Sequence, residues 1–302
     1  MRHLLTYRYI DAISKAGSIR QAAEALNITP SALNRRVQAF EEELGTPVFE
    51  RLPRGVRLNT VGELLIQHIR SQISDIERLK SKIADLEGIR RGHVPIACSQ
   101  ALLPYFLPRQ ITAYRTEHPA VTFSVLPRDR TAAEQALLDY SCDLALVFEP
   151  VRLAEFQTLA VVRQPVHAVM APDHPLAERE SLRLRDCLRH PLCLPTAPYG
   201  VRQLLEQAAA AKGQALTPLV QSDSFEFLRH YARAERILAF HIPIGLEPPR
   251  HPEDLVSRPI DERDVPAGLL LLGQLRHRAL PVASARFADR LLTAFQAEFE
   301  AA

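Results

Sequence analysis

Four side chains that can donate hydrogen bonds recur at steps of three and four residues early in the chain. They are Ser31, Asn34, Arg35 and Gln38. In a helix these steps place them on one face, and side chains of these types reach base edges and phosphates in the major groove of DNA. Thr29 and Pro30 precede them directly. Threonine is a typical helix cap, and proline at the first helical position loses no hydrogen bond, so we count both with the candidate DNA-binding residues.

Two helices joined by a turn are needed to position these donors. Ser18 followed three residues later by Gln21 is a capping box, which predicts a helix start, and Asn27-Ile28 reads as the turn. Apolar residues of the second helix recur at helical spacing until Gly45, which ends it. The pattern predicts a helix-turn-helix, preceded by a helix over residues 2–15. Two helices that only pack together are the alternative.

A short basic hairpin follows the second helix. Two β-like runs flank Leu52-Pro53-Arg54-Gly55, and the arginines at three-residue steps are Arg51, Arg54 and Arg57. A hairpin with arginines near its tip can enter a minor groove or clamp phosphates, as a wing does. The two caps and the basic hairpin together favour DNA binding over simple packing.

Residues 16–58 resemble the N-terminal domain of LysR-type transcriptional regulators. The resemblance rests on the motif Ala-Gly-Ser-Ile-x-x-Ala-Ala-x-x-Leu from Ala16 to Leu26, the Pro-Ser-Ala-Leu helix from Pro30, the run from Glu41 to Arg51, and Gly55 to Leu58. It implies a regulator that binds double-stranded promoter DNA as a homodimer or a dimer of dimers and recruits RNA polymerase. Asn34 stands where the family usually has Ser. Because asparagine can pair with adenine through two hydrogen bonds, this departure predicts a shift in the preferred site but not in the binding mode.

Composition limits the class of protein. The 302 residues are enough for two or three domains, and the net charge of +2 does not by itself mark a nucleic-acid binder. Residues 1–94 hold 15 Lys and Arg against 11 Asp and Glu, whereas the remainder holds 22 against 24, so the basic excess lies with the helix-turn-helix. The four cysteines form no Cys-x-x-Cys pair, which argues against a zinc site and a secreted disulfide framework. Without a signal-peptide core or a membrane-spanning apolar run, we expect a cytoplasmic protein with no membrane partner.

A long helical pattern without proline covers residues 61–87. Its apolar residues recur every seven positions in two series, Ile69, Ile76 and Ile83, and Leu65, Leu79 and Leu86, with Gln72 interrupting the second. Such a seam is typical of a two-stranded coiled coil, so we expect this helix to form a dimer. The alternative is a helix packed on its own domain. The family resemblance implies antiparallel pairing. Gly88 and Gly92 flank a basic segment that we interpret as a hinge.

Strand and helix signals alternate from residue 93 onward. In the first set the expected strands are 94–98, 121–126 and 144–148, and the expected helices are 102–117 and 131–140. This order predicts a parallel sheet with helices on its faces. In a second set the expected strands are 166–170, 192–194, 219–221 and 237–240, and the expected helices are 200–212 and 224–234. A fully buried strand over 268–272 and a last helix over 282–298 complete the pattern.

Two α/β units, with crossings near 161–166 and 266–270, describe a two-lobed binding fold. This again resembles the LysR-type effector domain, which is similar to periplasmic solute-binding proteins. The predicted fold class is therefore α/β: an N-terminal winged helix-turn-helix, a long linker helix and a two-lobed effector domain. The boundaries that we expect are 1–59 for the first domain, 60–92 for the linker and hinge, and 93–302 for the effector domain, with lobe I at 93–162 and 268–302 and lobe II at 163–267.

Ligands of such folds bind between the lobes, at the carboxyl ends of the strands. The candidate effector-binding residues of lobe I are Ser99, Gln100, Leu102, Arg128 and Phe148, and those of lobe II are Thr196, Tyr199, Gly200, Val201, Arg202, Asp223, Ser224, His241 and Ile242. Helix N-termini and nearby arginines favour a small anionic effector. Simple alternatives stay open: Ser99 and Asp223 as helix caps, Arg128 as a surface charge, and His241 as a contact between lobes.

Motifs for catalysis or metal binding do not appear. Cys98-Ser99 lacks the Gly-x-Ser-x-Gly elbow and a base placed by any motif, and His167 and His174 do not have metal-ligand spacing. We therefore expect no enzyme, no metal site and no cofactor. Two competing hypotheses remain: a solute-binding or enzymatic α/β module with an incidental helical N-terminus, and an architectural DNA-binding protein that takes no effector.

Overall fold

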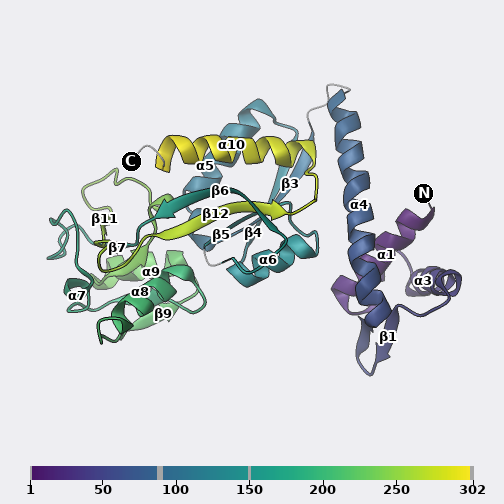
Figure 1. The fold of residues 1–302 in the computed structure, drawn as a ribbon, viewed down its shortest axis with the longest axis horizontal. Coiled ribbons are helices and arrows are strands. Elements are labelled where there is room, and N and C mark those ends of the chain that lie inside the picture. The colour runs from purple at the N-terminus through teal and green to yellow at the C-terminus, as the bar shows by residue number, and fades with distance from the viewer. Residues whose placement is uncertain (1, 87–90, 149–150, 300–302) are drawn as a thin grey trace. The chain divides into compact units, whose positions relative to one another are not determined.

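The computed structural model describes residues 2–86, 91–148 and 151–299 of the chain (Figure 1). The chain forms two compact units, with the boundary after residue 89. The hinge that we expected between Gly88 and Gly92 lies largely outside the described residues.

The first unit consists of helices around a small core, with a two-stranded hairpin and a long helix. Its elements are α1 (Arg2–Ala16), α2 (Ile19–Ala25), α3 (Pro30–Leu44), β1 (Phe49–Leu52), β2 (Gly55–Leu58) and α4 (Thr60–Leu86). The core contains Ile10 and Ile13 of α1, Leu33 and Val37 of α3, and Ile69 of α4. The helix-turn-helix, the hairpin and the long helix are thus all formed as predicted.

The expected caps define the ends of α2 and α3. The Ser18 hydroxyl accepts a hydrogen bond from the Gln21 amide at 3.4 Å, and the Thr29 hydroxyl accepts one from the Ala32 amide at 3.3 Å. Gly45 ends α3 in the left-handed region, at φ +80°, which a glycine adopts without strain. The start and end of α3 are therefore set by local chemistry.

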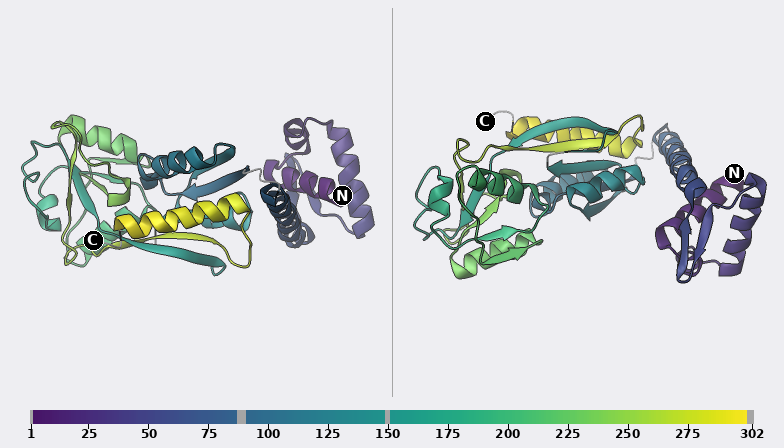
Figure 2. Two further views of the ribbon diagram at one scale, coloured as in Figure 1. Left: turned by 90° about the horizontal axis from the view of Figure 1, so that it is seen from above. Right: turned by 60° about the horizontal axis from the view of Figure 1, so that its bottom comes forward.

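The first sheet of the second unit has five strands in the order β4-β3-β5-β12-β6. Its elements are β3 (Gly92–Cys98), α5 (Phe106–Glu117), β4 (Val121–Pro127), α6 (Arg130–Leu138), β5 (Leu144–Phe148), β6 (Phe156–Gln164), β12 (Gly268–Leu275) and α10 (Val282–Phe299), with a 3-10 turn at Gln100–Leu102. Helix α10 runs along the sheet beside α5, and α6 lies on the other side (Figures 1 and 2).

The second lobe follows β6 and is built on two small sheets. The strands are β7 (His167–Met170), β8 (Cys193–Pro195), β9 (Val220–Ser222), β10 (Ala239–His241) and β11 (Val256–Pro259), and the helices are α7 (Leu184–Cys187), α8 (Gly200–Ala210) and α9 (Phe225–Glu235). Strand β7 pairs antiparallel with β10 and β11, whereas β8 and β9 are parallel. A bridge between Leu192 and Leu238 joins the two sheets.

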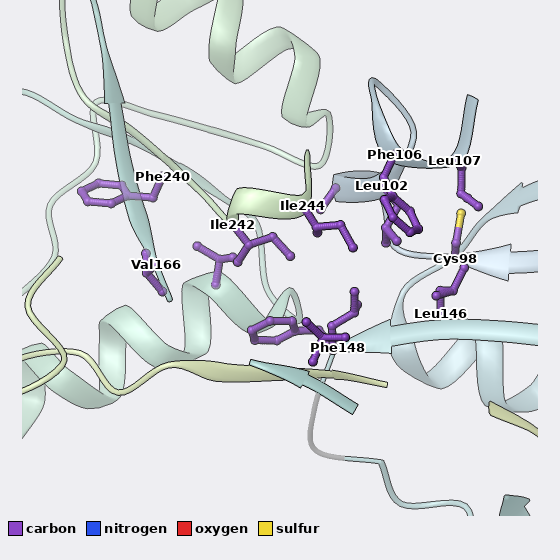
Figure 3. Packing of buried hydrophobic residues seen from close by; sticks show 14 of the residues in the cluster. Cys98, Leu102, Phe106, Leu107, Leu146, Phe148, Val166, Phe240, Ile242 and Ile244 are labelled. Carbon is purple, nitrogen blue, oxygen red and sulfur yellow. The ribbon is translucent and has the colours of Figure 1, made fainter. Parts of the chain in front are cut away.

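One continuous apolar core extends through both lobes. Figure 3 shows Cys98, Leu102 and Phe148 of the first lobe with Val166 and Ile242 of the second in the same cluster. A second 3-10 turn, Pro243–Gly245, contacts the turn at Gln100–Leu102. The two lobes are therefore packed against each other through this shared core and the contact between the two 3-10 turns.

Several expectations for this unit need correction. The first sheet is mixed, because β12 runs antiparallel to both β5 and β6. Strand β12 is not fully buried, since Leu269 and Leu271 are partly exposed. The helix expected from residue 102 starts only at Phe106, because a 3-10 turn covers Gln100–Leu102 and Tyr105 has a non-helical backbone conformation. Strands β6 and β11 were not predicted.

Candidate DNA-binding surface and interlobe pocket

Helix α3 buries its apolar side and exposes its donors. Leu33 is fully buried and Val37 is 4 % exposed, so both fix the helix against α1 and α2. Ser31, Arg35 and Gln38 are exposed, and Asn34 is half-buried. At the helix start the Thr29 and Ser31 hydroxyls lie 3.2 Å apart. This arrangement leaves a polar, cationic helix face open to a duplex groove.

The hairpin is attached to the end of α1. The Val56 amide donates to the Gly17 carbonyl at 2.9 Å. Gly55 has φ +112°, and a Cβ there would overlap that same carbonyl, so glycine is required at this position. The attachment holds the two-residue loop Pro53-Arg54 at the tip, away from the helices.

The three hairpin arginines are not equivalent. Arg51 and Arg54 are exposed. Arg57 lies opposite Glu50 in the strand pairing and forms an ion pair with it. Its guanidinium is therefore partly neutralised before any DNA arrives, which makes Arg51 and Arg54 the stronger candidates for phosphate contacts.

Helix α4 has two parts with different surroundings. In its first part Ile69 is fully buried and Leu65 packs on the same core, while Arg70 donates to the Asp11 carboxylate at 2.8 Å. In its second part Leu79 is 53 % and Ile83 is 48 % exposed. The predicted seam thus divides. Leu65 and Ile69 pack in their own domain, as the alternative hypothesis held, whereas Leu79 and Ile83 are exposed and Ile76 is half-buried. The side chain of Leu86, the last residue of the predicted seam, is not among those that the structure describes.

A small pocket lies where the strand ends of lobe I meet the start of α8 in lobe II. Five of the predicted effector residues line it: Ser99, Arg128, Phe148, Tyr199 and Gly200. Asp129, Arg130 and Pro198 also line it. These three residues adjoin predicted effector residues at the strand ends. The sequence therefore identified the correct segments, although these individual residues were not among the candidates. The pocket has a volume of about 20 Å³, which is room for roughly one water.

Phe148 is the reason why this pocket is so small. Its ring fills the space beside Gly200 and Gly268, where a Cβ at either glycine would overlap it. The residue itself is 8 % exposed. Beside the pocket the Gln100 amide group donates to the Tyr199 hydroxyl at 3.3 Å and joins the two lobes. In this arrangement an aromatic ring fills the pocket and a neighbouring hydrogen bond links its two sides.

Other predicted effector residues have different surroundings. Arg202 is held within lobe II by the Gln221 side chain at 2.8 Å and by Glu206. The Ser224 hydroxyl caps α9 by accepting from the Phe227 amide at 3.2 Å. Buried positions are Leu102, Val201, His241 and Ile242. Thr196 and Asp223 do not line the pocket.

Burial shifts the pKa values of several cysteines and histidines in this unit. Burial raises the pKa of the Cys98 thiol to about 12, and the same cause raises the pKa of Cys187 and Cys193, so these groups stay protonated. Burial lowers the pKa of His241 to about 4, so the ring is neutral at physiological pH. Within the described ranges no cluster of His, Cys, Asp or Glu is arranged to hold a metal ion. None of the described helices could span a membrane.

Comparison with known proteins identifies both units. Residues 4–63 match the family model for the bacterial regulatory helix-turn-helix protein, lysR family, and residues 87–296 match the model for the LysR substrate binding domain. The RuBisCO operon transcriptional regulator of Allochromatium vinosum is 26% identical over 227 residues, which are 75% of each chain. Among solved structures, full-length OxyR from Pseudomonas aeruginosa has a TM-score of 0.71 at 19% identity, covering 97% of this chain and 94% of that one. Full-length CbnR in complex with its target DNA has a TM-score of 0.62 at 17% identity, covering 96% and 99%.

Proposed function

Because the chain belongs to the LysR family of bacterial transcriptional regulators, we propose that α3 and the β1–β2 hairpin bind promoter DNA and that a small anionic effector in the interlobe pocket controls this binding. A DNA-binding regulator with an effector-binding domain, and no enzymatic activity, follows from the family itself. What we propose beyond this is which residues contact the DNA, which class of effector binds, and how the chains assemble.

One observation carries the DNA-binding part: the donors of α3 are exposed while the apolar face of the same helix is buried. Ser31, Asn34 and Arg35 read bases in this proposal, and Arg51 and Arg54 contact phosphates. Neither Arg35 nor Arg54 has an ion-pair partner within the described part of the chain. The structural likeness to CbnR, whose structure was determined in complex with its target DNA, supports DNA binding.

Titration of duplex DNA from the region upstream of the chain's own gene tests this part, at several stated salt concentrations. Arg35→Ala should weaken specific binding by roughly tenfold or more, since one side chain paired with a base contributes about 1–3 kcal/mol. Arg54→Ala should weaken binding to all sequences alike. The dependence of log K on log salt concentration should become less steep by about one unit, as expected for the loss of one phosphate contact. Arg189→Ala, an exposed arginine of lobe II, is the matched control. Equal binding by wild type and Arg35→Ala would show that α3 does not read the DNA.

An anionic effector is supported by the charges at the interlobe pocket. Two arginines, Arg128 and Arg130, line it against one carboxylate, Asp129, beside the N-terminus of α8, which favours negative charge; Arg130 is also paired with Glu134, so Arg128 is the stronger candidate. Thermal unfolding of the full chain in a series of small carboxylates and phosphate esters tests the class. Stabilisation by an anion, reduced in Arg128→Gln, supports the proposal. Stabilisation by cationic or neutral ligands alone contradicts it, and an architectural protein without an effector predicts no stabilisation by any compound.

The second part of α4 supports a homodimer. Ile76, Leu79 and Ile83 form the apolar surface that we assign to the partner helix, and two such dimers would form the tetramer that the family resemblance implies. RNA polymerase is the further partner in this proposal, and the cytoplasm is the compartment, because a bacterial regulator acts where the chromosome is.

A further inference from the structure

A second pocket lies within lobe II, and none of its lining residues is shared with the interlobe pocket. It is formed by helix α9, strands β7 and β11, and the segment 243–250. It has two compartments that share Arg229, Glu247, Pro248, Pro249 and Leu255, with volumes of about 210 Å³ and 290 Å³. Because an engineered cavity of about 150 Å³ is enough for benzene, the smaller compartment alone has room for a six-membered ring and a carboxylate.

The smaller compartment combines an apolar wall with two polar groups on neighbouring strands. Val169, Leu246 and Leu255 supply apolar surface. His167 of β7 and Ser257 of β11 lie beside them, with Nδ1 of the imidazole 3.4 Å from the serine hydroxyl. Burial lowers the pKa of His167 to about 4, so at neutral pH the ring adds a hydrogen-bonding group but no charge.

Arg229 of α9 is the charged group at the junction of the two compartments. Its Nε is buried without a hydrogen-bond partner among the described residues. It forms an ion pair with Glu226 of the same helix, but at 3.7 Å from Nη1 the carboxylate oxygen is beyond hydrogen-bond distance. The other carboxylate at the junction, Glu247, is already paired with Arg250. The guanidinium therefore keeps donors that a bound anion can use.

We propose that this compartment binds a small monocarboxylate with an apolar ring or branched chain. The carboxylate accepts hydrogen bonds from Arg229 and Ser257, and the apolar body lies against Val169, Leu246 and Leu255. An inorganic anion would satisfy the guanidinium but would leave the apolar wall uncovered, and a neutral ring would leave the buried Nε donor without a hydrogen-bond partner. Both features are met only by a ligand that has an acidic end and an apolar end.

Benzoate is the probe, titrated calorimetrically into the full chain near neutral pH, with neutral benzamide as the matched compound. We expect saturable benzoate binding that Arg229→Gln weakens by roughly tenfold or more, since it removes a charged hydrogen-bond donor. Ser257→Ala, which removes only a hydroxyl, should weaken it by a smaller factor. Arg189→Gln, at an exposed arginine of lobe II that lines neither pocket, should leave it within about twofold.

Each contrary result overturns the assignment in a different way. If Arg229→Gln and Ser257→Ala both bind benzoate like wild type, the ligand is not in this compartment. If Arg128→Gln abolishes binding instead, benzoate occupies the interlobe pocket, and the proposed effector site stands without this one. If neither benzoate nor a branched-chain acid binds, the proposed ligand class is wrong. Crystals soaked in 4-bromobenzoate locate the ligand directly, since its bromine atom should appear between α9 and β7. Thermal unfolding without ligand checks that Arg229→Gln still folds.

Discussion

Phe148 and Gly200 should be strongly coupled in their effect on stability. The nearest ring atom of Phe148 lies well under 3.0 Å from the place of a Cβ at residue 200, a distance that real Cβ atoms do not show. Gly200→Ala in the wild-type protein must therefore displace the ring. After Phe148→Ala the same methyl group enters space that the ring has left.

The structure sets the expected magnitudes. Phe148 is 8 % exposed, so Phe148→Ala should cost about 3–5 kcal/mol of unfolding free energy. Overpacking makes Gly200→Ala cost about 1–3 kcal/mol in the wild type. Residue 200 is the first residue of α8. In the Phe148→Ala background the substitution should instead stabilise by about 0.4–1 kcal/mol, because alanine reduces the entropy of the unfolded chain. The sign of the Gly200→Ala effect thus reverses, with a coupling energy of roughly 3 kcal/mol.

Urea denaturation of the four proteins measures this cycle. The chain has no tryptophan, so far-ultraviolet circular dichroism is the better signal. The control pairs Gly200→Ala with Phe227→Ala, an aromatic residue of lobe II that is 46 % exposed, and that pair should be additive within about 0.5 kcal/mol. If Gly200→Ala has the same effect with and without the Phe148 ring, the ring does not occupy this space and our account of the small pocket fails.

Three further changes test other parts of the structure. Asp143→Ala removes the carboxylate that pairs with the Arg278 guanidinium, whose side chain is 8 % exposed. The free energy of unfolding, measured by urea denaturation, should fall by about 3–5 kcal/mol, and a fall of less than about 1 kcal/mol would contradict a structural role for this pair. Asp264 accepts hydrogen bonds, above all from Arg183, and these hold its pKa well below the unfolded value of roughly 3.9. The ionised carboxylate therefore contributes its full share to folding stability above that pH, and this share is lost as the pH falls towards the folded pKa. The stability of Asp264→Asn should then fall less steeply than that of wild type between about pH 5 and pH 2, and parallel profiles would refute this. Ile83→Asp places a charge on the exposed part of α4 and should shift the protein to monomers in analytical ultracentrifugation, whereas an unchanged mass would exclude that surface from the dimer.

Local signals explain why α3 was predicted well. The Thr29 cap, the proline after it and Gly45 act within one helical turn of the residues that they order, so no distant contact has to be known. The pairing of β12 is the opposite case. Its sequence is that of a buried strand, but its antiparallel direction depends on a connection that returns from the second lobe. Strand β6 lies at the sheet edge with several exposed residues, so it lacks a buried-strand pattern.

The linker and the pocket show a second limit of sequence reasoning. A seven-residue apolar series identifies the face of α4 but not what covers it; Ile69 meets its own domain, while Ile83 is left open. For the pocket, strand-end segments were sufficient to find Arg128 and Tyr199. They did not distinguish these from Arg202, because its hydrogen bond to Gln221 depends on how the next strand, β9, packs beside α8.

The size of the interlobe pocket bears on how an effector would act there. A space for one water cannot hold a metabolite, so the proposed effector binds only to a state in which Phe148 has left Gly200 and Gly268. Part of its binding free energy then offsets the loss of that packing, and the apparent affinity is reduced by the small population of the open state. The same requirement makes the ligand a switch, since it has differential affinity for the two arrangements of the lobes. An anion that stabilises the wild type should therefore bind more tightly to Phe148→Ala, in which the displaced packing is already gone.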